Sequence, residues 1–344
     1  MKRAFLSLTL SLLLVASVRA QSPYTSSYFP LVNKAELAIA DSNYRAALDF
    51  YKRAFASVPR GFARDYFNAM ACAAATGDGA RTIDCIDTLL SLGADPRYLK
   101  EQPSLAALLH LTRNKDLEQH LNARVRPDGQ RIAMTSLFDS LAKIDQEFRR
   151  KEGSYRVYGD TIRKIDSLNI VLIRKIIDSA GFPGERMTGI SQPRSNGLPA
   201  NIVFVHHCQS LSLPKGKGKY NFKSDFIQAV DEGRMDPFDF ARLLAMQNDQ
   251  GFQLGTITAE VYSYGGLTSA YMVNPFTAAA ITVIDSIRLS HGLARLEDSY
   301  RKMAFALKNP RAKEFAMGNY GSVSYFPLET REEYDNLVKY LRPL

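Results

Sequence analysis

The sequence predicts a mainly α-helical protein, with helical hairpin repeats in its N-terminal part and a C-terminal helical domain that carries one small β-hairpin. Two observations lead to this fold class. Apolar residues recur at helical spacing through most of the chain, and helical segments end at glycine or proline, as at Pro59 and Gly181. A stretch around Gly265-Gly266 alternates polar with apolar or β-branched residues instead, which is typical of a hairpin.

The first twenty residues have the pattern of a cleavable signal peptide. Lys2 and Arg3 give a positive start, an apolar stretch runs from Phe5 to Val18, and Val18-Arg19-Ala20 suits a cleavage site. This stretch is shorter than the roughly 20 residues of a spanning helix, and Gln21 after the cut offers no thiol for a lipid. We therefore expect an exported protein, periplasmic or secreted, that is soluble after cleavage and has no membrane span in the mature chain.

Two amphipathic pairs of helices follow. In residues 35–54 the break Asp41-Ser42-Asn43 separates two helical patterns, and small Ala47 and Ala54 permit close approach of the helices, as in a tetratricopeptide repeat, which this pair resembles. A second pair covers residues 62–92 with its turn at Gly77-Asp78-Gly79, and short helices at 104–111 and 115–121 cap the stack. Such repeats present a concave surface to a protein or peptide partner, or a short stack packs on the next domain.

The length of the chain indicates its domain organisation, and its charge limits the kinds of partner. The 344 residues exceed the roughly 100 to 200 of a typical domain. We predict a signal peptide at 1–20, tetratricopeptide-like repeats at 21–130, a mostly helical domain at 131–310, and a C-terminal extension with a final helix at 311–344. The net charge of +9 includes three basic residues of the signal peptide, and both signs alternate along the helices, so we expect no nucleic-acid partner. Nothing in the sequence indicates an oligomeric state.

Cys72 and Cys85 are candidates for a disulfide. They lie level across the predicted hairpin, because the midpoint between them falls on the turn at residues 77–79, and an oxidising compartment permits the bond. The alternative is that both are small apolar packing residues. Cys208 is left as an odd thiol.

The C-terminal domain carries polar residues beside apolar helical stripes. One predicted helix, at 136–151, holds Asp145, Gln146 and Arg149, and a second, at 158–180, holds Asp166 and Asn169 before it stops at Gly181-Phe182-Pro183. His206 follows in an apolar run at 202–209 that fits either a buried strand or the start of a helix.

These residues resemble a bacterial domain family of unknown function over about residues 136–298. The motifs that carry the resemblance occur in the family's order: Asp145-Gln146-x-x-Arg149, Asp166-x-x-Asn169, Gly181-Phe182-Pro183 with Gly189, Val205-His206, Glu232-Gly233 with Ala241 to Asp249, Gln253-x-Gly255-Thr256, and Asp285-x-x-Arg288 with Gly292. The insertion at 210–220 departs from the family. The resemblance implies a mostly helical domain in which polar residues from several elements face one another, and it supplies no reaction.

The candidate site is therefore a polar cluster of seven residues: Asp145, Gln146, Arg149, Asp166, Asn169, His206 and Gln253. If they converge, Arg149 can fix an anionic group of a ligand while His206 beside a carboxylate acts as acid or base. The alternative is a satisfied buried network that holds the fold in register. We favour the network, because no nucleophile or complete catalytic set accompanies the histidine.

Metal and phosphate sites are not expected. His206, His207 and Cys208 are adjacent, so their side chains point in different directions on a helix or a strand and do not readily share one ion. The segment 215–219, Lys-Gly-Lys-Gly-Lys, lacks the spacing of a phosphate-binding loop. We predict no metal and no cofactor.

The remaining elements complete the fold. Strands are predicted at 256–264 and 267–273, helices at 275–289 and 295–307, and a final helix to Leu341 that opens with a capping box at Thr330 and Glu333. Two functions remain: an exported binding or scaffold protein that recognises protein or peptide through its repeats, which we favour, and a small-ligand-binding or hydrolytic domain centred on Asp145, Arg149, Asp166 and His206.

Overall fold

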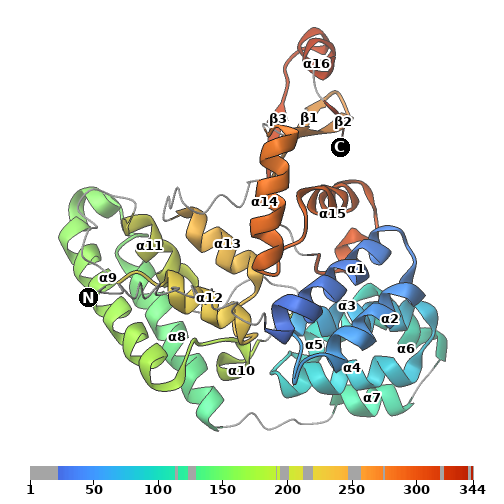
Figure 1. The fold of residues 1–344 in the computed structure, drawn as a ribbon, viewed down its shortest axis with the longest axis horizontal. Coiled ribbons are helices and arrows are strands. Elements are labelled where there is room, and N and C mark those ends of the chain that lie inside the picture. Colours follow the sequence, from blue (N-terminus) through green and yellow to red (C-terminus); the bar gives the residue numbers. More distant parts are fainter. Residues whose placement is uncertain are drawn as a thin grey trace, which may run out of the picture.

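The computed structural model describes residues 22–112, 115–122, 129–190, 192–193, 201–211, 220–246, 257–273, 276–317, 321–339 and 342–343. The fold is mainly helical with a small sheet, which confirms the predicted class. In Figure 1 the N-terminal helices, in blue and cyan, form one lobe, and the green and yellow helices form a second. The predicted signal peptide lies outside the described residues. Within the described residues, no helix combines the length and the apolar character needed to cross a membrane.

The first lobe contains the two predicted helical hairpins. After a π-helical turn η1 at Tyr24–Tyr28 come α1 at Phe29–Ala40 and α2 at Tyr44–Ala56, then α3 at Ala63–Thr76 and α4 at Gly79–Ser91. Asn43 caps α2 by accepting the Ala46 N–H at 3.2 Å, and Gly77 ends α3 at a φ of 75° that favours glycine. The breaks that the sequence shows at 41–43 and 77–79 are thus the turns of the two hairpins.

Three shorter helices complete the lobe: α5 at Pro96–Lys100, α6 at Pro103–Thr112 and α7 at Lys115–Asn122. Helix α6 packs on α3 and α7 packs on α4. They therefore extend the stack, and α6 and α7 correspond to the two short helices predicted at 104–111 and 115–121.

The two cysteines of the second hairpin are free thiols. Cys72 on α3 and Cys85 on α4 are both buried, and they are not bridged in this structure. Burial raises the pKa of both thiols, that of Cys85 to about 12, and a protonated thiol is a poor nucleophile. The two side chains here fit the alternative interpretation, in which they are small apolar packing residues.

The second lobe is built from α8 at Gly129–Glu147, α9 at Ser154–Ala180, the short α10 at Glu185–Thr188, α11 at Asn201–Leu211, α12 at Lys223–Asp231 and α13 at Pro237–Met246. The apolar run that fitted a strand or a helix is helix α11. Phe204 of α11 packs against Phe182, Phe222 and Phe226 with ring centroids 5.3 to 5.6 Å apart. Buried aromatic contacts therefore fix α11 in the lobe.

The sheet is larger than the predicted hairpin. Strands β1 at Ile257–Tyr264 and β2 at Leu267–Val273 form the antiparallel hairpin around Gly265-Gly266, which confirms that prediction. Strand β3 at Gly321–Pro327 adds to β1 in parallel, and the two-residue β4 at Arg342–Pro343 adds to β2, giving the order β3-β1-β2-β4. Figure 1 shows this sheet at the outer end of α14, at Ala278–Ser290, with α16 beyond it.

The final helix packs on one face of the sheet. Helix α16 at Arg331–Val338 starts with the predicted capping box of Thr330 and Glu333, although it ends three residues before the predicted Leu341. Its Tyr334 packs against Tyr262 and Tyr271. On the opposite face Ala259 packs against α14 and α15.

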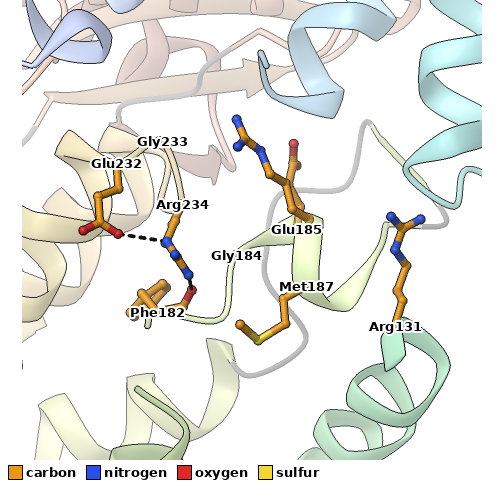
Figure 2. Close-up of a pocket in the computed structure, with 9 residues that line it drawn as sticks. Arg131, Phe182, Gly184, Glu185, Met187, Glu232, Gly233 and Arg234 are labelled. Carbon is orange, nitrogen blue, oxygen red and sulfur yellow. Dashed lines mark hydrogen bonds and ion pairs between the residues drawn. The ribbon is translucent and has the colours of Figure 1, made fainter. Parts of the chain in front are cut away.

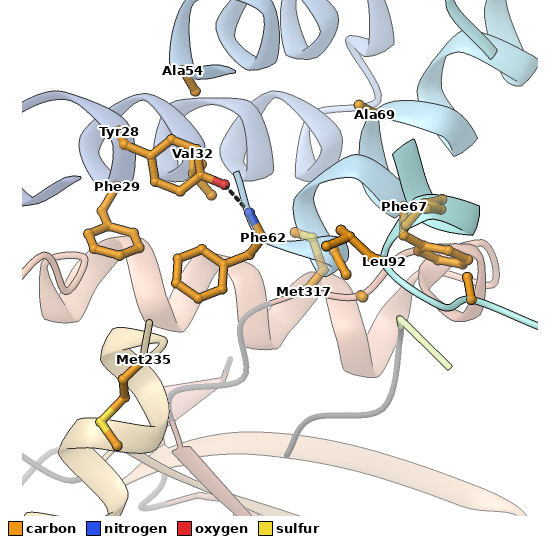
Figure 3. Close-up of a cluster of buried hydrophobic side chains, with 14 of the residues drawn as sticks. Tyr28, Phe29, Val32, Ala54, Phe62, Phe67, Ala69, Leu92, Met235 and Met317 are labelled. Atoms are coloured by element: carbon orange, nitrogen blue, oxygen red, sulfur yellow. Dashed lines mark hydrogen bonds between the residues drawn. The ribbon is translucent and has the colours of Figure 1, made fainter. Parts of the chain in front are cut away.

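The segment around helix α15, at Leu296–Lys308, returns to the first lobe. α15 packs on α1, and the following Ala316 exchanges two hydrogen bonds with the buried Asn68 side chain of α3, at 2.7 and 3.1 Å. Figure 3 shows Met317 near Phe62 and Leu92, and Met235 of the second lobe below Phe29 and Phe62. One hydrophobic core thus runs through both lobes, and the predicted boundary at residue 310 falls within a segment that packs on the repeats.

Candidate functional site

Four residues of the predicted polar cluster meet in the second lobe. Asp145 near the end of α8, Arg149 in the turn that follows, Asp166 of α9 and His206 of α11 are joined by direct contacts. The sequence spacing places Asp145 and Arg149 one helical turn apart, while α9 and α11 bring the other two from 17 to 61 residues away along the chain. We call these four residues the helical network.

Arg149 is the centre of this network. Its Nη2 donates to both carboxylate oxygens of Asp166 at 2.7 and 2.8 Å, and its Nη1 lies 3.2 Å from Asp145 Oδ1 and donates to the Asp145 carbonyl at 2.7 Å. Burial alone would lower the pKa of Arg149, but the two carboxylates outweigh burial and raise it. Because two carboxylates already hold the guanidinium, the hypothesis that Arg149 fixes an anionic ligand finds no support in this geometry.

Asp145 is the most buried member and His206 the most exposed. The Asp145 side chain has no solvent exposure, and its Oδ2 lies 2.8 Å from His206 Nδ1, whereas the His206 side chain is 18% exposed. Gln146 also donates to Asp145 Oδ2, at 2.8 Å. His206 Nδ1 has no hydrogen-bond partner among the described residues, so this contact is an ion pair without the directed hydrogen bond by which a carboxylate orients a catalytic histidine.

The two adjacent histidines have different partners. His207 is buried, and its Nε2 lies 2.6 Å from the Tyr220 carbonyl oxygen, while His206 faces Asp145. Neighbouring residues on a helix point about 100° apart, which explains the difference. Cys208, the third residue of this run, is buried and forms no disulfide with the other described cysteines.

The two remaining residues of the predicted cluster are not among these ion pairs. Asn169 is buried on α9, and its Nδ2 has no hydrogen-bond partner among the described residues. Gln253 lies outside the described residues. The described part of the cluster is thus a set of mutual ion pairs, mostly buried, with one solvent-reaching group at His206.

A pocket of about 480 Å³ lies in the second lobe, on the side where Glu185 bonds to the first lobe. It is lined by Arg131 of α8, by Phe182 and residues 184–187 around α10, and by residues 232–234 in the turn between α12 and α13. Figure 2 shows Arg131 and Arg234 on opposite sides of the segment that carries Glu185 and Met187. This size falls in the range of small-molecule sites, about 300 to 1,000 Å³. We call it the junction pocket.

Three arginines line the junction pocket, and backbone carbonyl groups orient each of them. Arg131 donates to the Ser91 carbonyl, Arg186 donates to the Arg60 carbonyl at 2.9 Å, and Arg234 donates to the Ala180 carbonyl at 2.9 Å. Arg131 Nε has no hydrogen-bond partner among the described residues. Arg234 Nε also lies 2.8 Å from the exposed carboxylate of Glu232.

Glu185 ties the pocket to the first lobe. Its Oε1 accepts the Ala63 N–H at the start of α3 at 2.6 Å. Burial, reinforced by the negative charges of Asp65 and Asp236, raises the pKa of Glu185 to about 8, against the lowering effects of the Ala63 hydrogen bond and Arg64. At neutral pH this carboxyl is therefore largely uncharged.

A second set of buried charges joins the lobes beside the pocket. Lys302 of α15 donates to Glu36 of α1 at 2.7 Å, and Arg64 of α3 lies 3.0 Å from Asp236, which precedes α13. Tyr28 donates to Asp65 at 2.6 Å, and burial raises the pKa of Asp65 to about 6. We call Glu36, Arg64, Asp65, Asp236 and Lys302 the junction network.

The sequence did not point to the junction pocket. Its arginines are spread over more than 100 residues and follow no shared spacing. The motifs Gly181-Phe182-Pro183 and Glu232-Gly233 were the available signal, since both border the pocket, but each is also typical of a helix stop. Their pairing becomes visible only when α10 packs beside the α12–α13 turn.

Compared with protein-family models, with curated proteins and with solved structures, the chain gives no match in any of the three. The resemblance of residues 136–298 to a family of unknown function stays a prediction, as does the likeness of the hairpins to tetratricopeptide repeats.

Proposed function

We propose that this chain is an exported small-ligand-binding protein, that its ligand occupies the junction pocket, and that its helical repeats serve as an internal scaffold. The observation that carries the proposal is the pocket itself. It has the volume of a small-molecule site and combines apolar walls at Phe182 and Met187 with charged groups. Small-molecule sites typically combine an apolar lining with a few placed polar groups in this way.

The packing of the repeats supports the scaffold role. The segment that follows α15 lies against them, with Phe315 stacked on Tyr44 at 5.5 Å between ring centroids and Ala316 bonded to Asn68. Part of the surface of the repeats is thus covered by the same chain. This favours the interpretation in which the short stack packs on the next domain over recognition of a separate protein or peptide.

A pocket-filling variant tests the proposal. Purified protein lacking residues 1–20 is screened by thermal shift against a panel of small metabolites, and hits are measured by calorimetry. Met187→Trp fills the pocket and should abolish binding, whereas Val157→Trp, at an exposed position on α9, should leave it unchanged. A folded Met187→Trp protein that binds the hits as tightly as the wild type would show that the pocket is not the site.

A second candidate function is acid–base chemistry at His206, and the 2.8 Å contact with buried Asp145 favours it. Here His206 would exchange the proton, and the nearby Asp145 carboxylate would stabilise the charged ring. A hydrolase panel run on the wild type, His206→Gln and Asp145→Asn tests this function. Activity lost in both variants at unchanged thermal stability supports it, and activity that persists in His206→Gln contradicts it.

A further inference from the structure

We infer that the ligand of the junction pocket is a small organic anion, selected by the positive charge of Arg131, Arg186 and Arg234 in the pocket lining. This inference rests on the proposed function and specifies its ligand class. The pocket lining contains three guanidinium groups and two carboxyl groups, Glu185 and Glu232. The balance of these charges decides which ligand fits.

Most partners of the three arginines orient the guanidinium groups without neutralising their charge. The hydrogen bonds to the Ser91, Arg60 and Ala180 carbonyl groups hold the side chains in place, yet a carbonyl oxygen carries no formal charge. Tyr24 likewise accepts from Arg186 as a neutral hydroxyl, at 2.6 Å. A guanidinium fixed in this way keeps its positive charge and its remaining donors for a carboxylate or phosphate.

The carboxyl groups offset only part of this charge. Glu232 pairs with Arg234. Glu185 faces Asp65 and Arg64 of α3 and Asp236 before α13, and its raised pKa of about 8 leaves it mostly protonated at pH 7. Three positive charges therefore stand against one negative charge, and an anionic ligand would restore the balance.

The rest of the lining indicates what carries the anionic group. Phe182 and Met187 provide an apolar wall, and the volume of about 480 Å³ admits a compact organic molecule. Arg186 is the most exposed of the three arginines, so it lies where an entering anion would meet it first. A small carboxylic acid or phosphate ester with a short apolar body matches these features.

Matched probes separate charge from shape. Glutarate and 1,5-pentanediol share a carbon chain but differ in charge, and inorganic phosphate supplies the anionic group without a body. We expect calorimetry at low salt to show saturable binding of glutarate and of phosphate, at least tenfold tighter than 1,5-pentanediol, and a loss of affinity as salt is added. Equal binding of glutarate and 1,5-pentanediol, or no binding of either anion up to millimolar concentration, would overturn the inference.

Variants locate the charge. Arg186→Gln should weaken the binding of glutarate at least fivefold. Arg186→Lys should weaken it by less, because lysine keeps the charge. The control Arg163→Gln removes an exposed arginine of α9 and should leave binding unchanged. If Met187→Trp blocks neutral hits while no anion binds, the pocket assignment stands and the anion inference fails. Glutarate binding that survives Met187→Trp would instead refute the pocket as the site.

Discussion

The two charge networks of this protein are built from similar residues but in different positions. The junction network joins helices far apart in the sequence, with Glu36 and Lys302 separated by 266 residues. Their side chains are 0% and 1% exposed. The helical network joins three helices of one lobe, and one of its members, His206, reaches solvent.

The difference separates a structural role from a chemical one. A fully buried ion pair has no route to a ligand, and removing one partner strands the other charge in a low-dielectric interior. A partly exposed histidine on a buried carboxylate can exchange protons with solvent. We therefore expect the junction network to dominate stability, and the helical network to contribute less as it approaches its exposed end.

The largest effect is expected for Lys302→Met. This change leaves the Glu36 carboxylate without its 2.7 Å partner inside the core, and breaking a buried pair in this way costs about 3 to 5 kcal/mol of the free energy of unfolding. Urea denaturation monitored by circular dichroism measures the loss. The exposed pair Glu147–Lys151 provides the control, since Lys151→Met should cost less than about 1 kcal/mol.

The double variant Glu36→Leu with Lys302→Met sharpens this test. Replacing both partners by apolar residues removes the stranded charge and should recover at least half of the loss. A single Lys302→Met variant that unfolds like the wild type would remove the distinction between the two networks.

Arg149→Ala should have the second largest effect. It removes one partner of Asp145, which keeps His206 and Gln146, and it releases the more exposed Asp166. We expect a loss of about 2 to 3 kcal/mol, smaller than at Lys302 because Asp166 can be hydrated. Arg163→Ala, which breaks the exposed pair with Asp160, should cost less than about 1 kcal/mol. A loss at Arg149 above that at Lys302 would reverse the ranking.

Most of the fold was predictable because its signals are local. The turn at Asp41-Ser42-Asn43, the glycine end of α3 at Gly77 and the capping box at Thr330 each lie within a few residues of the element that they define. The parallel strand β3 was missed because its partner β1 lies about 60 residues earlier in the chain. No local pattern marks such a pairing.

The same division applies to the candidate sites. Asp145 and Arg149 were predictable because helical spacing makes them neighbours, and the ordered motifs added Asp166 and His206. The junction pocket and the Glu36–Lys302 pair were not, because they depend on how α15 and the α12–α13 turn pack on the repeats. Cys72 and Cys85 show the converse: the sequence set their place on the hairpin, but not whether they are oxidised.

Glu185→Gln should change how stability depends on pH. The folded-state pKa is raised from 4.5 to about 8, so the wild type loses stability as pH rises from about 4.5 to about 8, where the buried carboxyl must ionise. Glutamine keeps an acceptor for the Ala63 N–H and does not ionise. Between about pH 6 and pH 8 the wild type should therefore lose roughly 2 kcal/mol of stability relative to the variant, as measured by urea unfolding.

The comparison should be made above about pH 6, because Asp65 and Asp239, whose pKa values burial raises to about 6, contribute below it. Glu232→Gln, at the exposed side of the same pocket, should change the free energy of unfolding by less than about 1 kcal/mol. A Glu185→Gln protein that loses stability between about pH 6 and 8 as steeply as the wild type would contradict the assignment.

His206→Ala should have the smallest effect, and the adjacent His207 provides its matched control. Removing His206 leaves Asp145 with Arg149 and Gln146, so the cost should stay below about 1 kcal/mol. His207→Ala removes a buried ring that packs against Phe222 at 5.4 Å and contacts the Tyr220 carbonyl, and should cost about 2 to 3 kcal/mol. Thermal and urea unfolding of both variants at one pH compares the loss of stability in His206→Ala with that in His207→Ala. If His206→Ala is as damaging as His207→Ala, the exposed end of the helical network is structural, and the case for acid–base chemistry at His206 is lost.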